Sequence, residues 1–154
     1  MNDDLGSERS GTVQARRGLS QVEARGDGFV LVVDDDESVL LSLKILLESE
    51  GYRVLAAVGG SEAVSLCGRH KGSIAAVVTD MMMPVMDGVA TIRALRALDP
   101  DLRFIAISGG LHWNEEEDLT PLDLIAFIQK PFRINELVQA LQKAAQSRRR
   151  RPSP

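Results

Sequence analysis

Short apolar runs alternate with amphipathic stretches through most of this 154-residue chain. Three of the runs are almost continuously apolar, as strands buried on both faces of a parallel sheet must be. Strands are predicted at residues 29–33, 52–56, 74–79, 103–107 and 124–128. Strands that alternate with helical patterns predict an α/β fold, a doubly wound parallel sheet of five strands.

Helices are predicted where apolar residues recur three and four positions apart. The last and clearest helix has one apolar face, made of Ile134, Leu137, Val138, Leu141 and Ala145. The first is expected to start within residues 36–38 and to stop at Gly51. Its predicted buried stripe consists of Val39, Leu43, Leu46 and Leu47.

The apolar patterns that predict the other helices are less clear. One is expected around residues 61–70, and another carries Val89, Ile92 and Leu95. The latter should end before Asp99, because the residue before a proline disfavours helical geometry. Residues 112–123 combine an acidic run with Pro121, so a short or irregular helix is expected there.

Composition indicates one folded domain, with 44% apolar and 26% charged residues. We predict a folded domain over residues 28–147, between a flexible extension (1–27) and a basic tail (148–154), since neither end shows apolar periodicity. No apolar run suits a signal peptide or a membrane span, so a cytoplasmic location is expected.

The net charge of -4 favours neither nucleic-acid nor membrane partners, although the arginine tail leaves weak DNA binding as an alternative. The single cysteine, Cys67, is interpreted as a packing residue.

Polar residues follow the predicted strands in positions that suggest chemistry. Asp34 and Asp35 come after the first strand, Asp80 after the third, Ser108 after the fourth and Lys130 after the fifth. If the strand order is 2-1-3-4-5, the first and third strands are neighbours where the order reverses. Ligands of doubly wound sheets bind beyond the carboxyl ends of the strands at that point. The three carboxylates are then expected to converge.

Converging carboxylates repel one another unless a cation lies among them, and an all-oxygen site suits Mg²⁺. A carboxylate can also act as a nucleophile and form an acyl phosphate. Lys130 would supply a positive charge and Ser108 a hydroxyl donor for phosphoryl oxygens. Each residue alone has a simpler explanation, since acids can begin a helix, a serine can sit in a turn and a lysine is a common surface charge. Their joint placement favours a site.

Three motifs resemble the receiver domain of two-component response regulators, which has a flavodoxin-like five-stranded fold. They are VVDDDE at 32–37, DMMMPVMDG at 80–88 and KPF at 130–132. The resemblance implies that Asp80 is the phosphoacceptor, that Asp34, Asp35, Asp80 and the backbone carbonyl of Met82 hold Mg²⁺, and that Lys130 contacts the phosphoryl group. It also implies that Ser108 and Phe127 are switch residues. Residues 109–126 depart from the usual pattern of the family, so altered partner specificity is expected.

Only 23 residues follow Pro131, so we expect a stand-alone receiver that signals through another protein. Its expected partners are a sensor histidine kinase or phosphotransfer protein and a downstream protein target, with a homodimer left open. It is not expected to be an enzyme, although it accepts a phosphoryl group and can lose it again. One alternative is a receiver-like adaptor or dimerisation module that works without phosphorylation. Another is a haloacid-dehalogenase-like phosphatase, whose Asp-x-Asp spacing occurs at Asp34 and Asp36.

Overall fold

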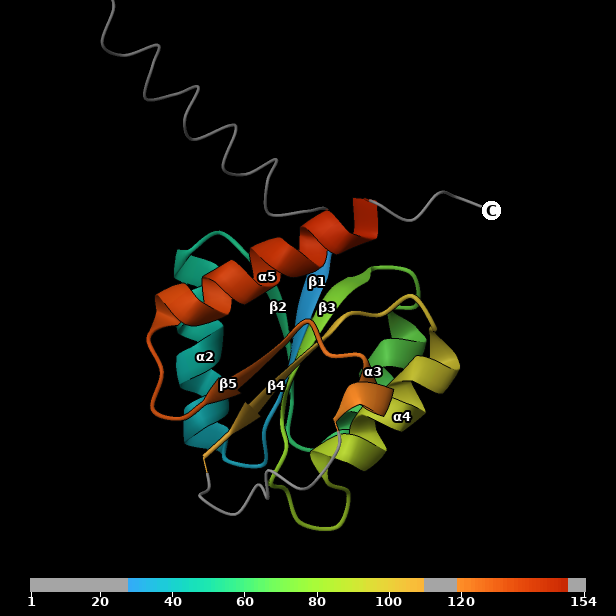
Figure 1. Cartoon of the computed structure of the whole chain (residues 1–154). Coiled ribbons are helices and arrows are strands. Elements are labelled where there is room, and N and C mark those ends of the chain that lie inside the picture. The colour runs from blue at the N-terminus through green and yellow to red at the C-terminus, as the bar shows by residue number, and fades with distance from the viewer. Residues whose placement is uncertain (1–27, 110–118, 150–154) are drawn as a thin grey trace, which may run out of the picture.

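The computed structural model describes residues 28–109 and 119–149, which form a parallel sheet with helices on both faces (Figure 1). The strands are β1 (Phe29–Val33), β2 (Arg53–Ala57), β3 (Ile74–Asp80), β4 (Phe104–Ser108) and β5 (Ala126–Gln129). Their order is β2-β1-β3-β4-β5, and all neighbouring pairs are parallel. The predicted fold and strand order are confirmed.

The first strand has the predicted bounds, the ends of the others differ from the predicted ones by one or two residues, and two of these differences bear on the site. Asp80 and Ser108 were expected just after their strands, but each is the last residue of its strand. The reason is that the ladder continues: Asp80 is paired with Ile107, and Ser108 with Gln129. Their backbone positions are therefore fixed by the sheet rather than by a loop.

The helices form two layers around the sheet (Figure 1). Helices α2 (Glu37–Ser49) and α5 (Ile134–Arg149) cover one face, and α3 (Gly60–Arg69) and α4 (Gly88–Leu98) cover the other. Because side chains alternate along a strand, β1 contributes Val30 and Val32 to one hydrophobic cluster and Leu31 and Val33 to the other. Both faces are apolar, which explains the continuous apolar runs in the sequence.

Local sequence sets where two of these helices begin. The Asp36 carboxylate accepts hydrogen bonds from the backbone N–H groups of Ser38 and Val39 at the start of α2. The Asp87 carboxylate does the same for Ala90 at the start of α4. Such caps satisfy backbone donors that have no partner within the helix. Helix α4 ends at Leu98, as predicted from the proline at position 100.

The predicted buried stripe of α2 was wrong in one member. Leu46 is 45% exposed, and the buried residues are Leu40, Leu43 and Leu47. At 100° per residue, Leu46 lies about 90° around the helix from the centre of that buried set. Several leucines in succession left the phase of the stripe ambiguous in the sequence.

The remaining predictions concern the ends of the chain and the stretch before β5. Within residues 112–123, the described part contains a short 3₁₀ helix, η1 (Thr120–Leu122), with Pro121 near its start. Residues 110–118, 1–27 and 150–154 lie outside the described residues, and so do the predictions made for them. Helix α5 runs to Arg149, two residues beyond the expected domain end. None of the described helices is long and apolar enough to cross a membrane.

Candidate functional site

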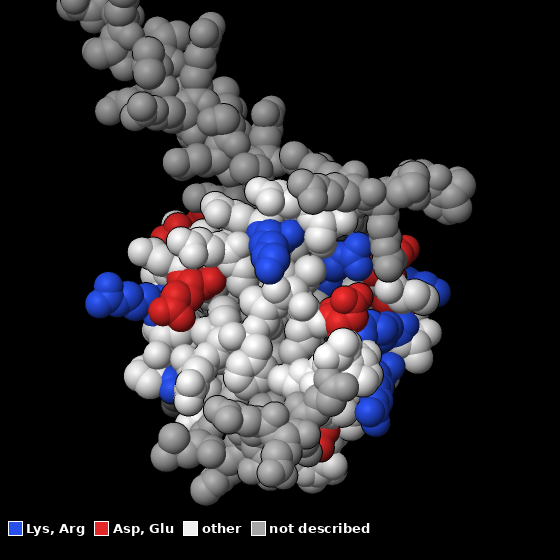
Figure 2. Space-filling view, in the orientation of Figure 1, with Lys and Arg blue, Asp and Glu red and all other residues white. Residues whose placement is uncertain are grey.

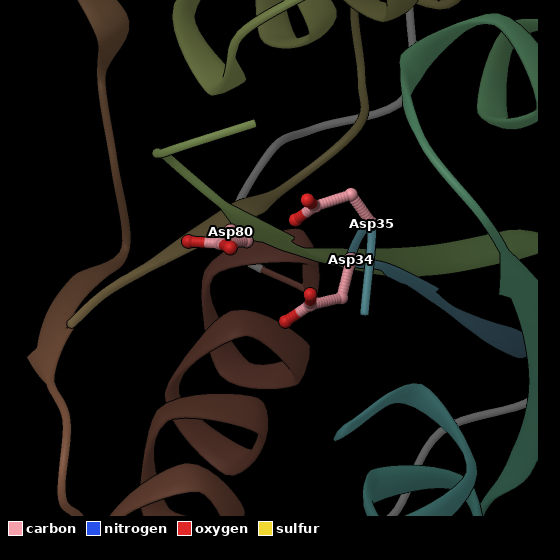
Figure 3. Close-up of side chains that lie close together, drawn as sticks. All are labelled: Asp34, Asp35 and Asp80. Atoms are coloured by element: carbon pink, nitrogen blue, oxygen red, sulfur yellow. The ribbon is translucent and has the colours of Figure 1, made fainter. Parts of the chain in front are cut away.

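Three carboxylates meet at the carboxyl edge of the sheet. Asp34 follows β1 and Asp80 ends β3, and these strands are neighbours, with Val33 paired to Thr79. One oxygen from each of Asp34, Asp35 and Asp80 lies within 4.8 Å of the others (Figure 3). Asp34 and Asp80 are buried, whereas Asp35 is exposed. The predicted convergence is confirmed, and the cluster opens to solvent on the side of Asp35.

Lys130, which directly follows β5, supplies a positive charge to this cluster from two strands away from β3. Its Nζ lies 3.3 Å from Oδ2 of Asp34 and 3.9 Å from Oδ2 of Asp80. To reach them the side chain passes over the end of β4, where a Cβ on Gly109 would lie 3.3 Å from Cδ of Lys130. Gly109 therefore leaves room for the lysine, a role that the sequence did not suggest.

The pKa of Asp80 is raised above its ordinary value, chiefly because burial removes the carboxylate from water. The N–H of Met82, which donates to Oδ1 of Asp80 at 3.2 Å, and the charge of Lys130 act in the opposite direction. The nearby charges of Asp34 and Asp35 raise the pKa further. One ammonium group thus faces three carboxylates, and the site keeps a surplus of negative charge.

The donor set fits a hard divalent cation. Asp34, Asp35 and Asp80 offer only oxygen ligands, without histidine or cysteine among them. Mg²⁺ takes carboxylate, carbonyl and water oxygens, and it would offset the surplus charge. Because Asp35 is exposed whereas Asp34 and Asp80 are buried, one side of the cluster is open to water or to a phosphoryl group. Met82 is placed beside Asp80 by its N–H, and the role of its carbonyl as a ligand stays a prediction.

Ser108 lies at the end of β4, the strand next to β3. Its side chain is buried, and its Oγ has no hydrogen-bond partner within the described part of the chain. A buried hydroxyl without a partner loses its hydrogen bonds to water without replacement. A new acceptor on Asp80 would therefore be a favourable partner for Ser108.

Phe127 lies on β5, opposite Ala106 of β4. Because strand residues two apart point to the same face, Phe127 shares the face of Ala106 and Ser108. Phe127 is 39% exposed, on the edge strand of the sheet. The structure thus places the two predicted switch residues on neighbouring strands and on one face, with Phe127 reaching the surface.

Known proteins resemble this arrangement along most of the chain. The sequence profile of the response regulator receiver domain matches residues 30–142. The crystal structure of a receiver domain protein from Clostridium thermocellum is 27% identical, has a TM-score of 0.73, and covers 79% of this chain and 97% of its own. The FixJ-N structure is 26% identical, with a TM-score of 0.71, and covers 84% of this chain and 99% of its own.

Curated relatives are larger proteins. The transcriptional regulatory protein PrrA of Mycobacterium tuberculosis is 38% identical over 109 residues, which are 71% of this chain and 46% of PrrA. The sensor kinase CckA of Brucella abortus is 33% identical over 118 residues, which are 77% of this chain and 12% of CckA. This chain therefore spans less than half the length of these relatives. From the profile match and the sheet topology together, the chain belongs to the response regulator receiver domain family.

Proposed function

We propose that this chain is a phosphoacceptor of two-component signalling, in which Asp80 takes a phosphoryl group from a phosphohistidine. Receiver domains generally bind Mg²⁺ at an acidic pocket and interact with histidine kinases or phosphotransfer proteins. The observation that carries the proposal is the meeting of three carboxylates with Lys130 at the carboxyl edge of the sheet. Asp34, Asp35, Asp80 and the Met82 carbonyl would hold the ion.

The proposed step is an in-line transfer to a carboxylate oxygen of Asp80. That oxygen forms a bond to phosphorus while the bond between phosphorus and the donor imidazole nitrogen breaks, and the electron pair stays with the nitrogen. If the other ring nitrogen carries a proton, the donor histidine leaves as a neutral imidazole. Bound Mg²⁺ supplies positive charge that offsets the carboxylates and the phosphoryl oxygens.

The chain's own residues prepare this step. The N–H of Met82 holds Oδ1 of Asp80, which leaves Oδ2 on the side of Lys130. Ionised Asp80 is needed as the nucleophile, and the Lys130 ammonium favours that form. The same ammonium lies close enough to pair with a phosphoryl oxygen on Oδ2. The product remains on the chain, which makes it a substrate of transfer rather than an enzyme.

The response of the fold to phosphorylation is proposed to pass through Ser108. Its unpartnered Oγ gains an acceptor when phosphoryl oxygens are attached to Asp80. Movement of Ser108 would alter the end of β4 and, through the neighbouring strand, the exposed ring of Phe127. In Figure 2 the surface at the centre of the view, around β5 in Figure 1, is largely uncharged, and basic and acidic side chains lie around it. Such a surface supports a protein target better than a nucleic acid.

The test is the intact mass after incubation with acetyl phosphate, with and without Mg²⁺. The parent should gain one phosphoryl group only with Mg²⁺, and Asp80→Asn should gain none. Asp87→Asn is the matched control, because it removes an acid from the same loop while asparagine can still cap α4. Labelling of Asp80→Asn at the parent's level would contradict the assignment.

A second candidate is the adaptor or dimerisation module that acts without phosphorylation. The observation in its favour is the outer side of α2, where Leu41 and Ile45 are both more than half exposed and lie one helical turn apart. Sedimentation of the parent and of Leu41→Ser with Ile45→Ser tests it. A parent that associates without phosphorylation and a double variant that does not would favour this candidate.

A further inference from the structure

The methionines of this chain are concentrated beside the proposed phosphoacceptor. Apart from Met1, all of them lie within residues 81–86, at positions 81, 82, 83 and 86. Met81 is 1% exposed and Met83 is 8% exposed, whereas Met82 is 51% exposed. Three consecutive thioethers thus have very different access to solvent. The loop combines one accessible sulfur with neighbours of the same chemistry that are shielded.

Glycine backbone packs against two of the other sulfurs. A Cβ on Gly88 would lie 2.6 Å from Sδ of Met81, and a Cβ on Gly60 would lie 2.6 Å from Sδ of Met86. Glycine backbone therefore covers one side of each sulfur, and Met86 is partly buried. Oxidation of methionine follows exposure, so Met82 is the preferred target in the loop.

Met82 is also tied to the acceptor through its backbone. Its N–H donates to Oδ1 of Asp80 at 3.2 Å, so the backbone of Met82 is in direct contact with the acceptor carboxylate. A change in the Met82 side chain therefore occurs on the residue that holds the acceptor carboxylate, next in the chain but one to Asp80.

We propose that Met82 is a modification site for two-electron oxidants of the peroxide class, and that its oxidation changes the rate of phosphorylation of Asp80. The thioether sulfur attacks one peroxide oxygen, the O–O bond breaks, and the other oxygen leaves as water after taking up a proton. Sulfur is oxidised to the sulfoxide and the peroxide is reduced. The coupling to Asp80 rests on the proposed function, whereas the oxidation itself does not.

The expected effect follows from the polarity of the sulfoxide. Oxidation turns the apolar thioether into a larger, polar but electrically neutral group with a strong S–O dipole, on the residue whose N–H holds Oδ1 of Asp80. The labelling rate of the oxidised chain should therefore differ from that of the untreated chain. Methionine sulfoxide reductases act on each of the two sulfoxide epimers, so treatment with both enzymes should restore the rate.

The first arm of the experiment maps oxidation alone. The full chain is exposed to hydrogen peroxide, digested, and analysed by mass spectrometry over time. Met82 should be oxidised at least about five times faster than Met81, Met83 and Met86, since accessible thioethers react first. Equal rates at all four positions, or faster oxidation of a buried one, would overturn the proposal.

The second arm measures the rate of labelling by acetyl phosphate with Mg²⁺ before and after peroxide. Each protein is compared only with itself. The labelling rates of the parent and of Met83→Leu should change after peroxide and return to their starting values with the two reductases, whereas that of Met82→Leu should not change on treatment. An unchanged rate in a parent that is oxidised at Met82 overturns the coupling. Absence of labelling before any peroxide would instead count against the proposed function and leave the first arm valid.

Discussion

Replacing Asp80 by asparagine should stabilise the fold in the absence of metal, although it removes the proposed phosphoacceptor. At 4.8 Å and an effective dielectric constant of about 20, each neighbouring carboxylate repels Asp80 by about 3.5 kcal/mol. Lys130, 3.9 Å away, attracts it by about 4 kcal/mol on the same scale. The net repulsion of about 3 kcal/mol falls to about 1–2 kcal/mol when solvent screening at exposed Asp35 is considered.

Asparagine preserves the local geometry, because its side-chain oxygen can still accept from the N–H of Met82. Urea and thermal unfolding at pH 7 with a metal chelator measure the change. The midpoint of thermal unfolding should rise by about 3–8 °C for a gain of 1–2 kcal/mol in a domain of this size. Glu136→Gln is the control, since it removes one negative charge from the first turn of α5, a helix that contributes none of the three carboxylates, and should be slightly destabilising.

The pH dependence gives an independent check. Asp80 has a raised pKa in the folded state, so the folded chain binds this proton more readily than the unfolded chain. Protonated Asp80 therefore contributes to the free energy of unfolding of the parent at low pH, and this contribution is lost as the pH rises through the raised pKa. The advantage of Asp80→Asn should be full at neutral pH and should shrink as the solution is acidified.

Metal should reduce this advantage of Asp80→Asn. At a Mg²⁺ concentration ten times its Kd, the parent gains about 1.4 kcal/mol, and a variant that lacks one carboxylate ligand gains less. The reasoning would be refuted if Asp80→Asn were no more stable than the parent without metal while the Glu136→Gln control behaved as expected. In that case the three carboxylates would not carry the repulsion inferred from their distances.

Three further predictions concern packing and backbone near the site. Ser108→Ala should leave the free energy of unfolding unchanged or raise it by about 1 kcal/mol, because the lost hydroxyl has no partner in the described part of the chain. Thr79→Val should lower the free energy of unfolding by about 1 kcal/mol, because it removes the hydrogen bond to the Asp80 carbonyl. Gly88→Ala should lower the free energy of unfolding by about 2 kcal/mol or more and weaken Mg²⁺ binding, since the new Cβ would lie 2.6 Å from Cα of Met81. Gly68→Ala, in open space on α3, should raise the free energy of unfolding by about 0.5–1 kcal/mol. Val85→Asn should raise it by about 1 kcal/mol, because the valine has a φ of 67°, which asparagine tolerates better. Urea unfolding checks all of these, and a reversed order within either of the first two pairs would contradict the packing argument.

The apolar pattern of the sequence determined the fold because burial on both faces of a sheet leaves little choice of residue. The run at 29–33 marks β1 without ambiguity, and the proline at position 100 fixed the end of α4. The convergence of Asp34 and Asp80 could be predicted from the sequence only for an assumed strand order of 2-1-3-4-5, in which their strands are neighbours, and the structure has that order. Where hydrophobic residues crowd one helix, as around Leu46, the same pattern was ambiguous and the phase was misjudged.

Tertiary structure decided what depends on distances between segments far apart in the chain. The sequence places Lys130 after the fifth strand, but only the fold shows its Nζ 3.3 Å from Asp34, across the space left by Gly109. Likewise, a serine at the end of a strand carries no sign in the sequence that its hydroxyl is buried without a partner. Hydrophobic periodicity is a local property that a single strand or helix imposes on its own residues. Pair distances, burial of polar atoms and the shift in the pKa of Asp80 arise only when several elements are packed together.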